Sequence, residues 1–292
     1  MIPEQYRLVR PVARAWRSPG VLQIGLDADG LVLHGVPGQL ADAVDALRQS
    51  RSLADLDRLL PALGTSLLEW FLHQLAGHGL LEPATEPGDQ PTLGIAVVGS
   101  GGLADDLCSL LHRSLGIAPT RIASSVPPTG ARPHHSGNYR ASPVLHWSAQ
   151  TQSWPELTIV ATETQEPDRA LTDALLRADR AHLVTRLEPA RAVVGPLVIP
   201  GRTPCVRCHD LLRCRYDPAW PRLVAQLCAE PAPIDPALQS WAVATTVAQV
   251  RCQLGGGTPD VTGRTLELGV EQSLHTREWP AHPECGCLLV VA

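Results

Sequence analysis

Two short cysteine motifs carry the strongest structural signal in this chain of 292 residues: TPCVRCH at 203–209 and HPECGC at 282–287. Each motif presents two sulfur atoms on a short loop, and a long segment separates the motifs. Four thiolates in two such pairs make the ligand set of a closed tetrahedral zinc site. We therefore predict a structural zinc ion with the ligands Cys205, Cys208, Cys285 and Cys287. The alternative is a set of four buried or disulfide-bonded cysteines.

Upstream of the first motif, a buried-strand pattern at Leu93–Val98 leads into a glycine-rich turn and then a helix. The spacing of Gly99, Gly101 and Ala104, with Gly102 among them, fits the G-x-G-x-x-G/A fingerprint of a strand–turn–helix unit. Tight turns between a strand and a helix also need glycine for steric reasons. The turn alone therefore does not establish nucleotide binding.

Strand-like and helix-like segments alternate through the rest of this region. The expected strands are Arg121–Ser124, Leu157–Ala161, His182–Thr185, Arg264–Val270 and Thr276–Trp279. The expected helices are Asp168–Ala178, between the second and third of these strands, and Ala237–Leu254, between the third and fourth. Such alternation predicts an α/β fold, a Rossmann-like and mostly parallel sheet with helices on both faces, over residues 92–292.

Residues 1–82 have a different organisation. Strand-like segments at Val21–Leu26 and Leu31–His34 flank an Asp-Ala-Asp-Gly turn, and Tyr6–Arg10 is a further expected strand. Three helical segments follow, of which the third runs from about Ser66 to Ala76. We predict a small winged-helix-like α+β domain here, joined to the α/β domain by a proline-rich linker at residues 83–91.

The third helix of this domain has no Arg or Lys with which to contact phosphates, so we expect no nucleic-acid binding. A hairpin with a free edge beside a helix suits an extended peptide that adds as a further strand. The predicted peptide-binding residues are Leu31, Val32, Leu33, His34, Trp70 and His73. A dimerisation or packing role for the domain is the alternative.

The composition narrows the class of protein. The formal net charge is -5, all 24 basic side chains are Arg, and 44% of the residues are hydrophobic. No apolar run approaches the length of a membrane helix and the first residues do not form a signal peptide, so we expect a cytoplasmic protein without membrane contact. The absence of lysine is typical of GC-rich bacterial sequences.

The order of these features resembles a known family. The glycine-rich turn, the stretch GPLVIPGRTPCVRC at 195–208, a late helix and the terminal HPECGC together resemble the ThiF-like relatives of ubiquitin-activating enzymes, over roughly residues 91–292. The N-terminal domain resembles PqqD-like peptide-recognition domains. The combination resembles the leader-peptide-binding proteins of thiazole/oxazole-modified microcin pathways, in which the two cysteine pairs hold a structural zinc.

Active ThiF-like enzymes bind ATP, and this sequence departs from what that requires. There is no Asp or Glu between Leu107 and Pro155, so the acidic ribose partner is missing, and no lysine is present for the phosphates. Asp105 and Asp106 at the start of the helix would repel phosphate, while Glu163 stands where the family has its metal-binding aspartate. We therefore expect a degenerate nucleotide loop, no catalytic residue and no ATP.

The resemblance implies a non-catalytic scaffold that binds the leader of a ribosomal precursor peptide and presents it to a YcaO-type cyclodehydratase. Two alternatives remain open. The first is an ATP-dependent adenylyltransferase that acts on a peptide carboxylate. The second is a zinc-stabilised structural protein that pairs as a homodimer.

Overall fold

The computed structural model describes residues 5–27, 29–83, 94–123, 155–232 and 234–288. The chain divides into two compact units, Met1–Pro91 and Thr92–Ala292. Most of the predicted linker, from residue 84, lies outside the described residues. In the described part of the chain, none of the helices has the length and apolar character needed to cross a membrane.

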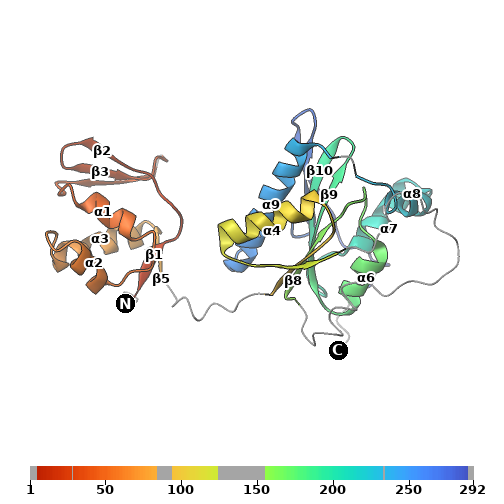
Figure 1. The fold of residues 1–292 in the computed structure, drawn as a ribbon, viewed down its shortest axis with the longest axis horizontal. Coiled ribbons are helices and arrows are strands. Elements are labelled where there is room, and N and C mark those ends of the chain that lie inside the picture. Colours follow the sequence, from red (N-terminus) through yellow and green to blue (C-terminus); the bar gives the residue numbers. More distant parts are fainter. Residues whose placement is uncertain (1–4, 28, 84–93, 124–154, 233, 289–292) are drawn as a thin grey trace. The chain divides into compact units, whose positions relative to one another are not determined.

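The first unit combines two small antiparallel sheets with three helices (Figure 1). Its elements in chain order are β1 (Tyr6–Leu8), β2 (Arg14–Ser18), β3 (Val21–Ile24), β4 (Leu31–His34), α1 (Leu40–Ala46), α2 (Leu53–Leu59), α3 (Thr65–Gly77) and β5 (Leu81–Pro83). One sheet has the order β2-β3-β4, and β1 pairs with β5 in the other. The three helices and the central hairpin agree with the sequence, whereas β2 was not expected. The winged-helix class remains a prediction.

Alternation of side chains along the β3–β4 hairpin explains its core. Leu22 faces Leu33 and Ile24 faces Leu31 in the register of the two strands, and all four side chains are buried. Because successive residues of a strand point to opposite faces, this register places every leucine and isoleucine of the hairpin on one face. That face packs on the buried stripe of α3, which includes Phe71.

The second unit contains one large sheet and five helices within the described residues. Its elements are β6 (Ile95–Val98), α4 (Gly102–Leu115), β7 (Thr120–Ile122), β8 (Leu157–Ala161), α6 (Arg169–Arg177), β9 (Ala181–Glu188), β10 (Arg191–Val198), α7 (Val206–Tyr216), α8 (Trp220–Leu227), α9 (Pro236–Leu254), β11 (Arg264–Gly269) and β12 (Leu274–Glu278).

The seven strands lie in the order β12-β11-β10-β9-β8-β6-β7. The pairs from β9 through β8 and β6 to β7 are parallel, while β9–β10, β10–β11 and β11–β12 are antiparallel. The mixed α/β class is therefore confirmed. The parallel part comes from strands joined through helices, and the antiparallel part comes from consecutive strands joined by short turns.

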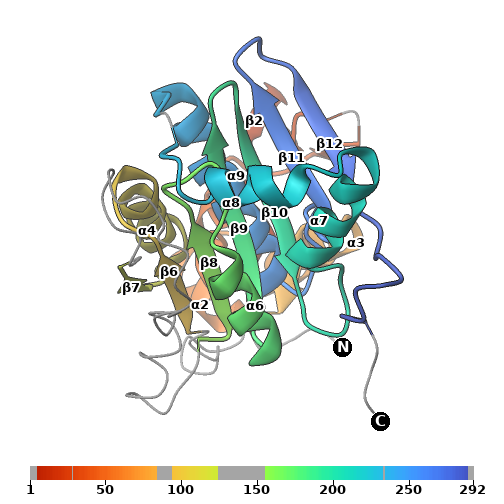
Figure 2. The same ribbon diagram turned by 90° about the vertical axis from the view of Figure 1, so that its right-hand side faces the viewer.

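Helices cover both faces of this sheet. Leu107 of α4 and Val247 of α9 pack with Ile159 of β8 on one face. Leu175 of α6 and Val206 of α7 pack with Val160 on the other. Figure 2 shows α6, α7 and α8 in front of the strands and α9 behind them. The unit is thus a three-layer α/β/α structure, with one hydrophobic core on each side of the sheet.

Candidate functional site

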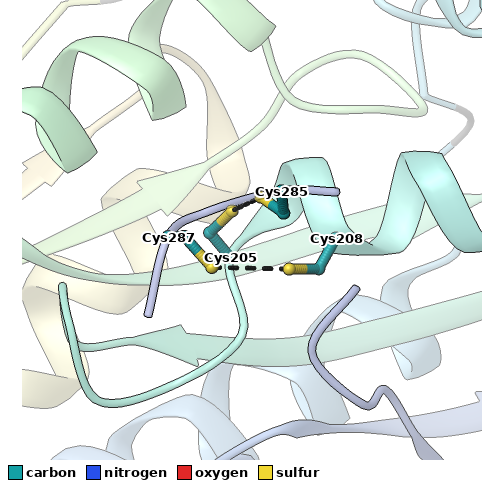
Figure 3. A group of neighbouring side chains, drawn as sticks. All are labelled: Cys205, Cys208, Cys285 and Cys287. Atoms are coloured by element: carbon teal, nitrogen blue, oxygen red, sulfur yellow. Dashed lines mark hydrogen bonds between the residues drawn. The ribbon is translucent and has the colours of Figure 1, made fainter. Parts of the chain in front are cut away.

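The four predicted zinc ligands come together in space. Cys205 caps the N-terminus of α7 and Cys208 lies in its first turn, while Cys285 and Cys287 lie in the turns that follow β12. All four Sγ atoms lie within 4.8 Å of one another. Figure 3 shows the four side chains pointing toward a common centre. The two motifs therefore form one cysteine cluster, the only group of this kind found among the described residues.

The cluster fits a tetrahedral metal ion. The Sγ atoms of Cys205 and Cys285 are 3.4 Å apart, as are those of Cys208 and Cys287. Four sulfurs at about 2.3 Å from a central zinc ion would stand about 3.8 Å from one another, whereas a disulfide requires about 2.05 Å. Four cysteines in this arrangement could hold a metal ion. Such an ion would have no open position for a substrate, as in structural rather than catalytic zinc sites.

The surroundings of the cluster lower the pKa of one thiol, that of Cys208. The backbone N–H of His282 donates to the Sγ of Cys208 at 3.4 Å. The hydrogen bond from Cys205 and this backbone donor lower the pKa of the Cys208 thiol to about 4, despite its burial. The same thiol–thiol hydrogen bond raises the pKa of Cys205, to which burial adds. A metal ion binds cysteine as thiolate, so an incoming ion would displace the protons that the thiols of the cluster hold.

Aromatic side chains stack next to the cysteine cluster. The ring of His209 stacks on the indole of Trp279, and the Arg213 guanidinium lies over the indoles of both Trp220 and Trp279. His209 is not a member of the cysteine cluster. Sequence reasoning missed this packing because the residues of the stack come from α7, α8 and the segment after β12. Nothing in their spacing links them.

The glycine-rich turn lies between β6 and α4, as the sequence predicts. Gly99 has a φ of +153°, and a Cβ there would lie 2.1 Å from the carbonyl oxygen of Ala161 at the end of β8. Gly101 caps α4 with a φ of +81°. Gly102 opens the helix, and Ala104 is fully buried. The steric demand of the neighbouring strand therefore accounts for Gly99 without any ligand.

Side chains of the chain itself engage this turn. Arg121, the middle residue of β7, donates to the carbonyl oxygen of Gly99 and pairs with Asp105 at 3.0 Å. Gln239 of α9 donates to Asp106 at 2.6 Å, and its amide nitrogen would lie 3.2 Å from a Cβ at Gly102. Both acidic residues of the first turn of α4 are thus bound within the fold.

The predicted peptide-binding strand lies at a sheet edge. β4 is the last strand in the order β2-β3-β4, and its one ladder within the described residues is the one with β3. Leu31 and Leu33 are buried in the core, Val32 is half-buried and His34 is exposed. The backbone edge is therefore available to an added strand. The side chains of the two leucines face the core of the domain, and their predicted role in peptide binding stays a prediction.

The two predicted helix contributors are on the surface of α3. Trp70 is 39% exposed, and the Nδ1 of exposed His73 contacts the carbonyl oxygen of Glu69 at 2.8 Å. Trp70 follows buried Leu68 by two positions, and His73 precedes buried Leu75 by two. On a helix with about 3.6 residues per turn, that offset turns both side chains away from the core. A shared role of Trp70, His73 and β4 in peptide binding remains a prediction.

A chain of ion pairs crosses the α7 side of the sheet, which we call the ion-pair ladder. Its members alternate in charge in the order Asp210, Arg169, Glu166, Arg186, Glu188, Arg191, Glu267 and Arg277, with Arg213 as a further partner of Glu166. The ladder ties α6 and α7 to the last four strands of the chain. Its arginines are scattered through the sequence, so no local pattern predicts it.

Glu166 is the centre of the ladder. Its side chain is 6% exposed and accepts hydrogen bonds from Arg169 at 2.9 Å and from Arg213 at 2.7 Å. Burial alone would raise the pKa of this carboxyl, but the charges of Arg186, Arg169 and Arg213 lower it to about 2. The carboxylate is therefore ionised at neutral pH, and it holds three guanidinium groups in place.

Several proteins of known structure share this fold. No protein-family model matches the sequence, and no curated protein matches it. Solved structures do match. A heterocyclase in complex with substrate and cofactor has 14% sequence identity and a TM-score of 0.61, over 98% of this chain and 39% of that chain. The heterocyclase TruD has 15% identity and a TM-score of 0.58, over 98% of this chain and 43% of that chain.

A third similar structure is E. coli MccB with AMPCPP and MccA, which has 14% identity and a TM-score of 0.55 over 97% of this chain and 99% of that chain. At these identities the likeness establishes a shared fold and nothing more. The chain spans about two fifths of the length of each heterocyclase and nearly the whole of MccB.

Proposed function

We propose that this protein is a non-catalytic scaffold that binds the leader of a ribosomally made precursor peptide. It presents that peptide to a YcaO-type cyclodehydratase in azole or azoline biosynthesis, and it acts in the cytoplasm. The observation that carries the proposal is the unpaired edge of β4, within the described residues, on a sheet whose β3–β4 hairpin is held by the core of the domain. An extended peptide can add there through main-chain hydrogen bonds.

The kinds of protein that share the fold support this role. Two are heterocyclases, and MccB is described as a microcin C7 biosynthetic enzyme in complex with N-formylated MccA. Most of the length of the heterocyclases has no counterpart in these 292 residues. A separate protein that performs the chemistry is therefore part of the proposal.

The glycine-rich turn supports a role without nucleotide. Arg121, in the middle of β7, is committed to the carbonyl oxygen of Gly99 and to Asp105. Gln239 closes on the start of α4. ATP would have to displace both side chains and then face Asp105 and Asp106. The cysteine cluster, which we assign to zinc, would then stabilise a domain that does no chemistry.

The direct test is calorimetric titration of the zinc-loaded full chain with the leader peptide encoded beside its gene. We expect a dissociation constant in the micromolar range or tighter. A scrambled leader of equal composition is the control. Binding absent at ~100 μM, which corresponds to less than about 5.5 kcal/mol, would contradict the proposal.

An ATP-dependent adenylyltransferase acting on a peptide carboxylate is the second candidate. The match to MccB with AMPCPP over nearly its whole length favours it, as does the position of Glu163, whose Oε1 would lie 3.6 Å from a Cβ at Gly101. Pyrophosphate exchange with ATP and peptide separates the two functions. Exchange that a Gly101→Val substitution abolishes would replace the scaffold proposal.

The third candidate, a zinc-stabilised structural protein, predicts self-association through the α/β unit and no affinity for any leader. A homodimer is compatible with the scaffold proposal too. Only leader binding, measured beside the mass in solution, separates these two functions.

A further inference from the structure

A cavity of about 450 Å³ lies over the ion-pair ladder. Its walls come from the loop after β8, the β9–β10 turn, α7, α8 and the two last strands. Figure 2 shows α7 and α8 in front of these strands. The volume is that of a typical small-ligand site. None of the predicted binding residues lines it, so the cavity is a separate feature of the fold.

Most of the charged groups that line the cavity are already paired. Three arginines (Arg191, Arg213 and Arg277) and four carboxylates (Glu166, Glu188, Asp217 and Glu267) line it, and all of these except Asp217 belong to the ladder. Glu166 and Glu267 are each 6% exposed, and each accepts from at least two guanidinium groups. A charged ligand would have to take a partner from such a pair. Removing a partner from a buried pair leaves an uncompensated charge, so the cavity discriminates against charged ligands.

The rim of the cavity offers aromatic and neutral polar groups. Tyr216 is 89% exposed at the end of α7. Trp220 has one face covered by Arg213 at 4.3 Å, and its indole N–H donates to Asp210. The amide of Gln165 also lines the cavity. Tyrosine and tryptophan combine apolar contact area with a polar group, and a side-chain amide both donates and accepts, so these groups can contact a peptide backbone.

We propose that this cavity binds a short uncharged segment of a peptide. It would contact the backbone through Gln165 and Tyr216 while the paired charges of the ladder reject Asp, Glu, Lys and Arg side chains. This inference rests on the proposed function in one respect: the natural ligand would be a neutral stretch of the same precursor peptide, outside its leader.

The test uses three capped pentapeptides, N-acetyl-Gly-Ser-X-Ser-Gly-amide with X as Asn, Asp or Arg. Each is titrated into the zinc-loaded full chain and followed by the indole N–H resonance of Trp220, which a Trp220→Phe variant assigns. We expect the Asn peptide to bind at least ten-fold more tightly than the other two. Equal affinity for all three, or no shift with the Asn peptide at 10 mM, would overturn the proposal.

Charge variants make the test sharper. Arg277 lines the cavity and is 53% exposed, so Arg277→Gln removes one positive charge while Glu267 keeps Arg191. We expect this variant to move preference about ten-fold toward the Arg peptide. Glu278→Gln, the next residue of β12, breaks an exposed pair with Arg264 outside the cavity, and it should change nothing. A preference that both variants alter alike would contradict a site at the ladder.

The outcome is separable from that of the scaffold proposal. Leader affinity is measured on the same samples, and Arg277→Gln should leave it unchanged. Leader binding without capped-peptide binding would overturn the cavity inference alone. The reverse result would overturn the scaffold proposal and leave the cavity as a peptide site.

Discussion

The imidazole of His209 stacks on the indole of Trp279, with ring centroids 4.3 Å apart and ring planes 13° apart. His209 directly follows the ligand Cys208 in α7, and Trp279 begins the segment that carries Cys285 and Cys287. The two cysteine motifs are therefore in contact through this pair of aromatic rings as well as through the cysteine side chains. This contact does not depend on a metal ion.

Removing the metal should loosen only the segment beyond this stack. We expect a chelator to raise the hydrogen-exchange rates of residues 281–287 at least ten-fold, while β11 and β12 keep their protection, because Trp279 also donates to Thr265 at 3.0 Å. Exchange mass spectrometry before and after chelation measures this. Unchanged exchange at 281–287 would show that no metal restrains the segment.

Substitution of one ligand should abolish metal binding. We expect Cys208→Ser to lower the zinc content from one ion per chain to near none, as determined by elemental analysis. We also expect the variant to melt at a lower temperature, because a loss of about 3 kcal/mol in stability lowers Tm by roughly 6–12 °C in a domain of this size. Cys214→Ser, on the same helix but outside the cluster, is the matched control and should retain the metal.

Proline in β4 should weaken capture of the leader. Val32→Pro removes a backbone N–H and restricts the edge strand, so we expect at least a ten-fold loss of affinity, about 1.4 kcal/mol. Ala15→Pro, placed in β2 at the opposite edge of the same sheet, is the control. If both variants bind the leader equally well, strand addition at β4 is not the mode of recognition.

Loss of the central charge of the ladder should be costly. Glu166→Gln leaves three arginines around a neutral amide, and we expect a loss of about 3–5 kcal/mol in the free energy of unfolding. Glu82→Gln, which removes an exposed partner of Arg7, should cost no more than about 1 kcal/mol. Urea denaturation measures both. Similar costs would mean that the ladder contributes nothing beyond an ordinary surface pair.

Acidification should destabilise the α/β unit through His182. Burial lowers the pKa of this histidine to about 4, although its hydrogen bond to the Arg180 carbonyl opposes the shift. The unfolded chain, with a pKa of about 6.5, takes up the proton first, so stability is complete above pH 6.5 and falls as the pH drops toward 4.

The size of this effect can be isolated by substitution. Between pH 7 and pH 5 the His182 contribution falls by about 2 kcal/mol. His182→Asn keeps a donor near the Arg180 carbonyl but cannot titrate, so its unfolding free energy should depend less on pH by that amount. The other titrating groups are the same in both chains, so the difference between the two pH dependences reports His182 alone. An identical pH dependence in both chains would contradict the assignment.

Several elements could be predicted because their signals are local. β8 and β4 were predicted at their observed bounds, and α9 to within one residue, since a run of apolar residues or a helical period bounded by turn residues marks each of them. The cysteine cluster followed from spacing alone. Cysteines that bind one ion come in closely spaced pairs, and such pairs can be recognised in the sequence without a structure.

Other features could not be read in this way. β2 has the sequence RAWRS and is exposed along most of its length, so it shows no alternation of apolar residues. α7 buries Cys208 and His209 rather than an aliphatic stripe, which hides its helical period. The ladder depends on long-range pairs such as Arg191 with Glu267, which only the folded sheet brings together.

The separation of the cysteine motifs has a consequence for the lifetime of the folded domain. Partners in the cluster lie 79 and 80 positions apart, so a bound ion would turn α7–β12 into a closed ring. An ion that binds only when both motifs are in place stabilises the folded domain by mass action and leaves the unfolded chain unchanged. If the ring closes only after the distant strands have met, it is absent from the folding transition state. Metal supply would therefore govern how slowly the finished domain opens, not how quickly it assembles.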